Sequence, residues 1–305
     1  VAIGNAGGYG KLTVAGSVAV VADDANKKVS FWSTGNGDSE NAKIAVDNDG
    51  STTNTGEMKF STRNASNSLA ERMRISASGN VAIGNTDPEA FGSLIDNLVV
   101  GTTSGNNGMT IVSGTDSGGR FCFSDNTASP QRGMIEYDHP SDSFLISTAG
   151  TQALKIDSSG AITKTLQPAF QVSYSAGGVS NLTTNQFNNL AFSAETFDIG
   201  SNHDGTTFTA PVTGKYMFAI SLTFLNLDKD HTNWEMVLVT SNRNYQTSNT
   251  FDDWLEVDAG AITGHLTVLA DMDASDTAFI KIAPTGGASQ TDIHSTSYWS
   301  GYLAC

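Results

Sequence analysis

The first half of the chain is built from a pattern that occurs more than once. Residues 81–85, Val-Ala-Ile-Gly-Asn, repeat the first five residues 80 positions later, directly after the run Glu71-Arg-Met-Arg-Ile-Ser-Ala-Ser-Gly-Asn. A weaker copy of that run occurs at Ala153-Leu-Lys-Ile-Asp-Ser-Ser-Gly-Ala-Ile-Thr. Copies of one pattern fold into copies of one structural unit, so a period of about 80 residues predicts tandem modules. The pattern ends near residue 164, where we expect a different domain to begin.

Short runs that alternate apolar and polar side chains recur in both copies. Lys27-Lys-Val-Ser-Phe-Trp and Glu57-Met-Lys-Phe-Ser-Thr are two such runs in the first copy, and Gly133-Met-Ile-Glu-Tyr is one in the second. A period of two is the pattern of a half-buried β-strand, and the segments rich in Gly, Asn and Asp between the runs suit tight turns. The sequence therefore predicts antiparallel β units at residues 1–80 and 81–164.

Three local features of the second copy can also be predicted. Gly108-Met-Thr-Ile-Val has the composition of a strand, and residues 87–95 could form one short helix with Asp87 as its N-cap and Pro88 in its first turn. Cys122 lies in a predicted strand and is expected to be a small buried side chain. Two cysteines in the chain are too few for a disulfide framework.

The repeats resemble those of bacteriophage tail fibres. The resemblance rests on the pattern Glu-Arg-Met-Arg-Ile-x-x-x-Gly-Asn-Val-x-Ile-Gly from Glu71 and on Gly133-Met-Ile-Glu-Tyr-Asp-His, and it covers about residues 1–164. It implies a homotrimeric shaft. Each unit is poor in large apolar side chains, so association of several chains is a way to bury its strands. Because the chain opens in mid-repeat, we expect a longer polypeptide whose N-terminal part contacts other virion tail or baseplate proteins.

A different pattern begins near residue 165. A turn at residues 211–214 is followed by Tyr216, Phe218 and Ile220, whose spacing predicts a strand with these side chains pointing inward. Roughly eight to ten strands in the last part of the chain fit a jelly roll. Trp234 and Trp299 lie within or at the start of predicted strands, where core or trimer packing is expected.

Motifs in this last part resemble the globular head of the complement/tumour-necrosis-factor superfamily. They fall at Ala169-Phe170, Asn188 to Phe192, Phe208 to Phe218, and Ser300 to Leu303. The resemblance covers residues 168–303. It implies a jelly-roll trimer with both termini at its base, exposed loops at the far end, and binding without chemistry. The predicted fold class is thus all-β and homotrimeric, with tandem shaft units at 1–80 and 81–164 and a jelly-roll head at 165–305.

An excess of acidic residues excludes one class of partner. The formal net charge is −15, and residues 166–305 hold 14 acidic but only 4 basic residues. Binding to a phosphate backbone needs clustered Lys and Arg, so no nucleic-acid partner is expected. The charge is compatible with a cationic partner, with divalent cations, or simply with solubility. No apolar run approaches the length of a membrane span, so no membrane insertion is expected.

No motif for catalysis stands out. The five histidines lack the spacing of metal ligands, and no Gly-x-Ser-x-Gly, Walker or Rossmann pattern appears in context. We therefore expect no enzyme and no cofactor. Calcium is the one ion with candidate ligands. The carboxylates of Asp228 and Asp230, or those of Asp252 and Asp253, could bind it or lie in solvated turns. A long polar loop is predicted at residues 241–250, and receptor contacts are predicted there and just beyond: Arg243, Tyr245, Asp252, Asp253 and Trp254.

These inferences lead to one functional hypothesis and three alternatives. The hypothesis is a trimeric virion fibre protein, external to the host cell, whose head binds a host-surface glycan or protein. One alternative is a purely structural fibre or whisker in which the head only closes the trimer. A polysaccharide depolymerase would need a pair of carboxylates in a groove, and no residues suggest one. A cellular adhesin with the same modules is the third.

Overall fold

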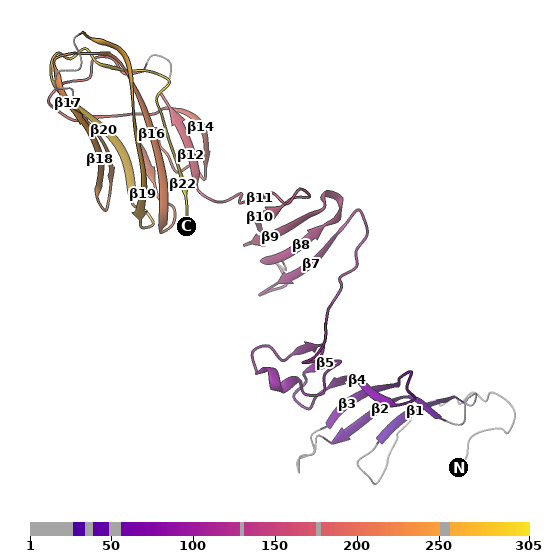
Figure 1. The fold of residues 1–305 in the computed structure, drawn as a ribbon. Coiled ribbons are helices and arrows are strands. Elements are labelled where there is room, and N and C mark those ends of the chain that lie inside the picture. The colour runs from indigo at the N-terminus through magenta and orange to yellow at the C-terminus, as the bar shows by residue number, and fades with distance from the viewer. Residues whose placement is uncertain (1–26, 34–38, 49–55, 129–130, 175–177, 251–256) are drawn as a thin grey trace, which may run out of the picture. The chain divides into compact units, whose positions relative to one another are not determined.

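The computed structural model describes residues 27–33, 39–48, 56–128, 131–174, 178–250 and 257–305 (Figure 1). The chain divides into two compact units, residues 1–111 and 112–305. The predicted all-β class is confirmed, since the described residues hold only two short 3-10 helices, η1 (Pro88–Phe91) and η2 (His139–Ser141), besides strands. None of the helices in these residues is long and apolar enough to cross a membrane.

The first unit holds one sheet of six strands in chain order. All neighbouring strands are antiparallel except the last pair, β5 and β6, which are parallel. The predicted repeat boundary at residues 80/81 falls inside this sheet, because β5 follows that boundary and pairs with β4. The strands are β1 (Lys27–Ser33), β2 (Ser39–Asn48), β3 (Gly56–Arg63), β4 (Leu69–Ile75), β5 (Val81–Ile83) and β6 (Leu98–Val100).

The second sheet has the same meander order as β1–β5. Its strands are β7 (Gly118–Phe123), β8 (Gly133–Asp138), β9 (Ser143–Thr148), β10 (Thr151–Ile156) and β11 (Ile162–Thr163), each antiparallel to the next. The last turn is the same in both sheets. Gly79 N–H donates to Ser76 C=O at 3.0 Å with φ +88°, and Gly160 N–H donates to Asp157 C=O at 2.9 Å with φ +85°. The repeated Ser-Gly run encodes this turn, because glycine accepts a positive φ without steric cost.

Three local predictions in this region were wrong. Residues 108–112 form no strand, because no partner strand pairs with them within the described chain. The expected helix at 87–95 is only the single turn η1, and the Asp87 side chain makes no capping hydrogen bond. Cys122 is exposed, because it lies on β7, the edge strand of an uncovered sheet.

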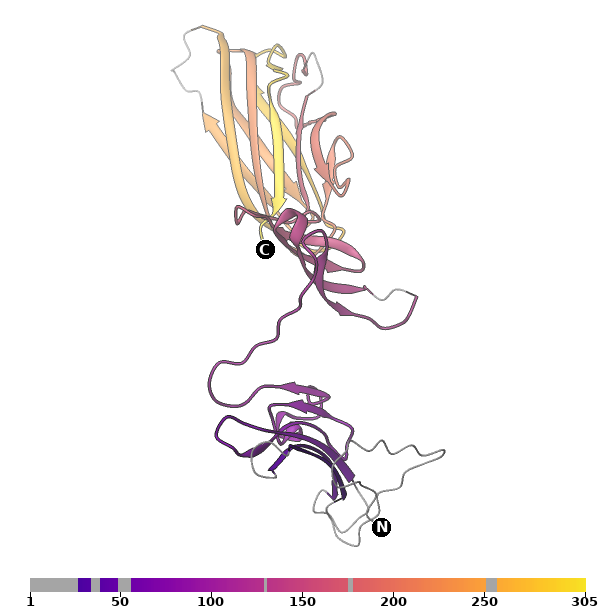
Figure 2. The same ribbon diagram turned by 90° about the vertical axis from the view of Figure 1, so that its right-hand side faces the viewer.

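Residues from Ala169 onward form the head, a jelly roll of two sheets, as predicted. One sheet has the order β14-β12-β22-β16-β19, with β21 on β16; the other has β13-β20-β17-β18, with β15 on β20. Figures 1 and 2 show the long strands running from one end of the head to the other. The strands are β12 (Ala169–Ser173), β13 (Asn188–Asn189), β14 (Ala194–Ile199), β15 (Thr207–Thr209), β16 (Gly214–Leu227), β17 (His231–Thr240), β18 (Asn244–Thr250), β19 (Ala259–Met272), β20 (Thr277–Gly286), β21 (Asp292–Ile293) and β22 (Tyr298–Leu303).

Aromatic side chains fill the core between the two head sheets. Tyr216, Phe218 and Ile220 point inward as predicted, and so do Trp234 and Trp299. The Trp299 ring packs edge-on against Phe170 at 5.0 Å between centroids. Burial of rings this large supplies much of the hydrophobic stabilisation of a domain.

Candidate functional site

The two ends of the head differ in chemistry. One end, called the base here, holds the start of β12, the end of β22 and the β17–β18 turn. The opposite end, called the distal end, holds the connections β16–β17 and β20–β21 and the start of β19. In Figure 1 the mark for the C-terminus lies at the base. A ligand that meets the head from outside therefore encounters two chemically separate surfaces.

The predicted recognition loop at residues 241–250 is not a loop. Residues 244–250 form β18, an edge strand paired with β17, and only a short turn precedes it. The polar, Asn-rich composition of this segment predicted a loop. A strand depends on pairing of its backbone with a neighbouring strand, so a polar segment can also form one. Arg243 and Tyr245 come together at the base. Arg243 Nη2 lies 2.9 Å from Asp271 Oδ2, and the Tyr245 hydroxyl donates to Asp271 Oδ1 at 3.2 Å.

This geometry bears on the predicted receptor contacts. Arg243 is 59% exposed, so its guanidinium is reachable from solvent even though it is paired. Tyr245 is half-buried and packs on the core. Both lie where the chain enters the head rather than at the far end, and their contact with a receptor stays a prediction. Asp252, Asp253 and Trp254 lie outside the described residues.

The two candidate calcium ligands have different surroundings. Asp228 is buried, and its carboxylate accepts the backbone N–H of Asp230 at 2.9 Å and of Ala288 at 2.5 Å. The hydrogen bond from Asp230 lowers the pKa of Asp228. Asp230 is 67% exposed and pairs with Lys229. Within the described residues, no group of three or more His, Cys, Asp or Glu side chains is placed to hold a metal ion.

His231 ties two distal connections together. It is 2% exposed, and its Nδ1 lies 2.8 Å from the Gly286 carbonyl oxygen. A carbonyl only accepts, so Nδ1 donates this bond, and Nε2 lies 2.8 Å from the Thr291 hydroxyl oxygen. The hydrogen bonds of Asp228 and His231 therefore link the β16–β17 connection to the β20–β21 connection at the distal end.

A polar hollow of about 450 Å³ lies at the distal end above these residues. Asp292 accepts the Asn181 backbone N–H at 2.7 Å and the Asn226 side-chain amide at 2.8 Å. Asp258 accepts the Lys229 backbone N–H, which lowers the pKa of its carboxyl. The hollow is lined by Ser180, Asn181, Asn226, Asp258, Gly260, Gln290 and Asp292. It offers two carboxylates and several amides, a set suited to hydroxyl groups or a cationic group.

Sequence reasoning missed this hollow. Its residues come from four segments separated by about 30 or more residues, and none carries a local motif. Only the pairing of β16 with β19 and β21 brings Asn226, Asp258 and Asp292 to one end of the head. The nearest signal in the sequence was Asp228, which lies beside the hollow and supports it.

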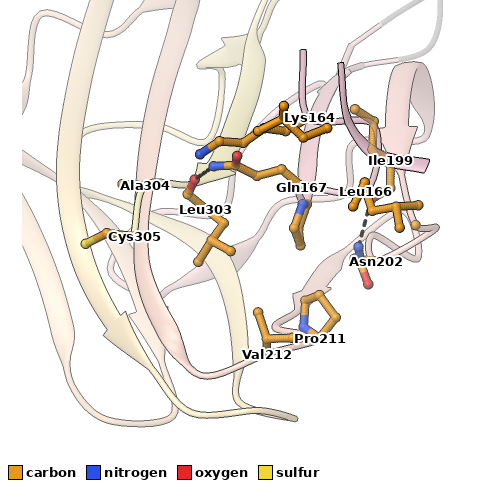
Figure 3. A pocket seen from close by; sticks show the side chains of 14 residues that line it. Lys164, Leu166, Gln167, Ile199, Asn202, Pro211, Val212, Leu303, Ala304 and Cys305 are labelled. Carbon is orange, nitrogen blue, oxygen red and sulfur yellow. Dashed lines mark hydrogen bonds between the residues drawn. The ribbon is translucent and has the colours of Figure 1, made fainter. Parts of the chain in front are cut away.

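The base carries a different, apolar hollow of about 580 Å³ (Figure 3). Leu166, Ile199, Val212 and Leu303 contribute most of its labelled apolar side chains. The Gln167 amide donates to the Leu303 carbonyl, which fastens the entering chain to the last strand. Lys164 is the one charged residue in its lining. The lining of this hollow is therefore suited to packing against apolar groups rather than to polar or ionic contacts.

An apolar row crosses the outer face of one head sheet beside this hollow. Strand register aligns five residues, one on each strand, and directly paired residues share a face. This row, called the head row below, consists of Ile199, Ala169, Tyr302, Met217 and Leu269. Tyr302 is 49% and Leu269 53% exposed. The outer face of the other sheet mixes charged residues such as Glu235 and Lys281 with apolar residues such as Val239 and Phe279.

Comparison with known proteins agrees with this fold. Residues 169–304 match the model of the C1q domain family. The head is therefore C1q-like. Among solved structures, the chain is similar to the globular domain of zebrafish complement 1qA protein, with 16% identity, a TM-score of 0.35, and coverage of 46% of this chain and 98% of that one.

Two further solved structures are similar. The Eiger TNF from S. frugiperda shares 9% identity with a TM-score of 0.35, covering 46% of this chain and 93% of its own. Murine APRIL also shares 9% identity, with a TM-score of 0.33 and coverage of 45% and 98%. No curated protein matches the chain. The C1q-like assignment rests on the family model and on the strand order of the head.

Proposed function

We propose that the chain is a virion fibre protein that assembles as a homotrimer and binds a host-surface receptor through its C1q-like head. The observation that carries the proposal is the joining of two tandem meander sheets to such a head. The meander repeats resemble those of bacteriophage tail fibres, which supports an external location on a virion. The head supplies the surface for recognition.

The head row supports self-association of the head. A row of exposed apolar side chains that crosses a whole sheet is unfavourable in a free monomer and is typical of an interface. The outer face of the opposite sheet carries charged residues among its apolar ones, so it is less suited to an apolar interface. The resemblance to complement/tumour-necrosis-factor heads implies three copies. The apolar hollow at the base adjoins the head row, and both would then lie at or near the interface between copies.

The distal hollow is the receptor site in this proposal. It lies away from the base, and its carboxylates and amides can accept and donate hydrogen bonds to a glycan or bind a cationic group of a protein. Contacts of this kind fix orientation, whereas affinity grows when several heads of one particle bind together. A trimer of weak sites therefore suffices for attachment.

The test is adsorption of the labelled full chain to a panel of bacterial strains, together with competition against virions that infect a bound strain. Asp258→Asn at the distal hollow should lower adsorption at least tenfold, whereas Asp273→Asn, at an exposed aspartate of the base, should leave it within twofold. The reverse result would move the receptor site to the base. Absence of adsorption to every strain, including those that the virion infects, would leave only the structural fibre.

The structural fibre is the second candidate, and the head row is the observation that favours it, because a head that closes the trimer needs no receptor site. The proposal assigns binding and not catalysis to the head. Capsular polysaccharide of an adsorbing strain should therefore keep its chain length during incubation with the protein. Shortened polysaccharide would instead identify a depolymerase.

A further inference from the structure

The first meander sheet carries two rows of apolar side chains on one face. Strand register aligns them across the sheet, so the members of each row project to the same side. One row is Val29, Ile44, Phe60, Met73, Ile83 and Val100; the other is Val46, Met58, Ile75, Val81 and Leu98. Val29 is 50%, Val46 48% and Leu98 56% exposed. Lys27 pairs with Val46 at the β1 edge of the second row, and all other members of both rows are uncharged.

The opposite face of the same sheet carries ion pairs. Arg74 Nη1 lies 2.9 Å from Glu57, and Arg74 donates two further bonds to Glu71 at 2.6 and 2.9 Å. Glu57 is only 8% exposed. The hydrogen bonds to Glu71 raise the pKa of Arg74, and the charges of Glu57 and Glu89 add to this effect. Glu89 lies on the β5–β6 connection and acts on Arg74, so this connection covers the face of the sheet that carries the ion pairs. The apolar face of the sheet stays open.

The second meander sheet repeats this arrangement. Its two apolar rows are Phe121, Ile135, Ile146 and Leu154, and Tyr137, Phe144, Ile156 and Ile162. The Tyr137 and Phe144 rings meet edge-on at 4.9 Å, which places both on one face. Arg120 pairs with Glu136 at 2.5 Å on the other face, where Glu136 is 7% exposed. Phe121 and Phe144 are 47% and 49% exposed.

The rows of the two sheets correspond position by position. Strands β2 to β4 match β8 to β10, so Ile44 corresponds to Ile135 and Phe60 to Ile146. Met58 and Phe144 occupy equivalent places in the second row. At the matched positions of β2 to β4 and β8 to β10 both sheets have an apolar side chain, although few of the residues are identical. At the edge of the second row, Lys27 on β1 corresponds to Gly119 on β7. A face that stays apolar in two copies of divergent sequence indicates contact with a surface outside the unit.

We propose that the apolar faces of both meander sheets are interfaces between copies of this chain. The aligned rows carry no charge except Lys27 at the edge of the first sheet, so the surface that covers them must be largely apolar, since an unpaired charge buried against them would be costly. A partner must also cover two such faces that one chain carries in tandem. Another copy of the chain presents both faces in the same order, and symmetric association of identical faces satisfies both. The inference rests on the proposed self-assembly and extends it from the head to residues 27–163.

Neighbouring residues on β7 allow a matched test in the full chain. Phe121 lies on the apolar face and Cys122 on the ionic face, and both are exposed in the single chain. In a Cys305→Ser background, one variant keeps Cys122, and the other combines Phe121→Cys with Cys122→Ser. The rate of labelling by a maleimide is measured for each variant in native buffer. The same measurement in denaturant compares the intrinsic reactivity of the two thiols.

In the assembled particle, the thiol at position 121 should label at least tenfold more slowly than Cys122, with equal rates in denaturant. Val46→Cys, placed in a background without Cys122 and Cys305, should be protected likewise and tests the first sheet. Light scattering on each variant confirms that the particle is still assembled. Equal rates at positions 121 and 122 in a multimeric particle would overturn this inference and leave assembly through the head intact. A chain that is monomeric by light scattering would overturn both.

Discussion

Asp228 and Asp230 are two positions apart, yet their side chains have different roles. The Asp228 carboxylate is buried under two backbone N–H groups, and that of Asp230 is exposed beside Lys229. Asp228→Ala should lower the free energy of unfolding by about 1.5–3 kcal/mol, because it leaves buried donors without an acceptor. Asp230→Ala should change it by less than about 0.5 kcal/mol, as is usual for exposed pairs. Urea denaturation of both variants measures the difference, and equal losses would contradict it.

The same residue predicts a pH dependence. The folded-state pKa of Asp228 is lowered from its ordinary value of 3.8, so its contribution to stability is complete above that pH. It is lost as the pH falls through the folded-state pKa. Melting temperatures of the native chain and of Asp228→Asn should therefore converge below about pH 3.8. A constant gap down to the acid limit would show that the carboxylate charge is irrelevant.

His203 predicts a second pH effect at higher pH. It is stacked on Phe170, and its Nδ1 accepts the Gly205 N–H at 3.0 Å, so the ring is neutral. Burial lowers its pKa below the ordinary 6.5, although Asp204 and Asp198 act in the opposite direction. Below pH 6.5 the unfolded chain gains a proton that the folded chain does not, so stability falls as the pH drops through that value. His203→Asn should flatten this part of the melting-temperature profile, whereas the exposed His265→Asn should not.

At the scale of the element, strand β22 packs closely against the two aromatic strands beside it. A Cβ built on Gly301 would lie 2.6 Å from Phe218 Cδ1 and 2.8 Å from Phe170 Cε1. Gly301→Ala should therefore destabilise the head by about 1–3 kcal/mol through overpacking. Gly260 on β19 has no atom within 4 Å of such a Cβ, so Gly260→Ala should stay within about 0.5 kcal/mol. Calorimetry of the two variants compares them, and similar melting temperatures would count against close packing at β22.

At the scale of the whole molecule, assembly is predicted to use the head row and the meander faces together. The native chain should have three times the 31.9 kDa mass of one chain in light scattering. Tyr302→Lys alone, or Ile146→Lys alone, should raise the concentration of half-dissociation at least tenfold, because each buries a charge in one of the interfaces. Both together should give single chains. Glu235→Lys on the outer face of the other head sheet is the control and should leave the mass unchanged. A double variant that stays trimeric would place the interface elsewhere.

The sequence by itself determined the all-β class and the jelly roll of the head, although the predicted boundary at residues 80/81 falls inside the first sheet. Period-two alternation and the repeated Ser-Gly turn predicted β units, and the inward series Tyr216, Phe218 and Ile220 predicted a core strand of the head correctly. These features are local, because side-chain alternation and a glycine at positive φ are set within a few residues. Local patterns also misled. The polar edge strand β18 was taken for a loop, and residues 108–112 were taken for a strand.

The tertiary structure alone decided which residues meet. Strand pairing across as many as 66 residues brings Asn226, Asp258 and Asp292 to one hollow, and no motif in the sequence marks them as neighbours. The alternation of each meander strand predicted that one face is apolar, but only the register showed that whole rows are apolar while Glu57 and Arg74 pair on the covered side. Alternation is a property of one strand, whereas a binding hollow or an interface is a property of several strands in register. That is why the sequence could predict the fold class and not the sites.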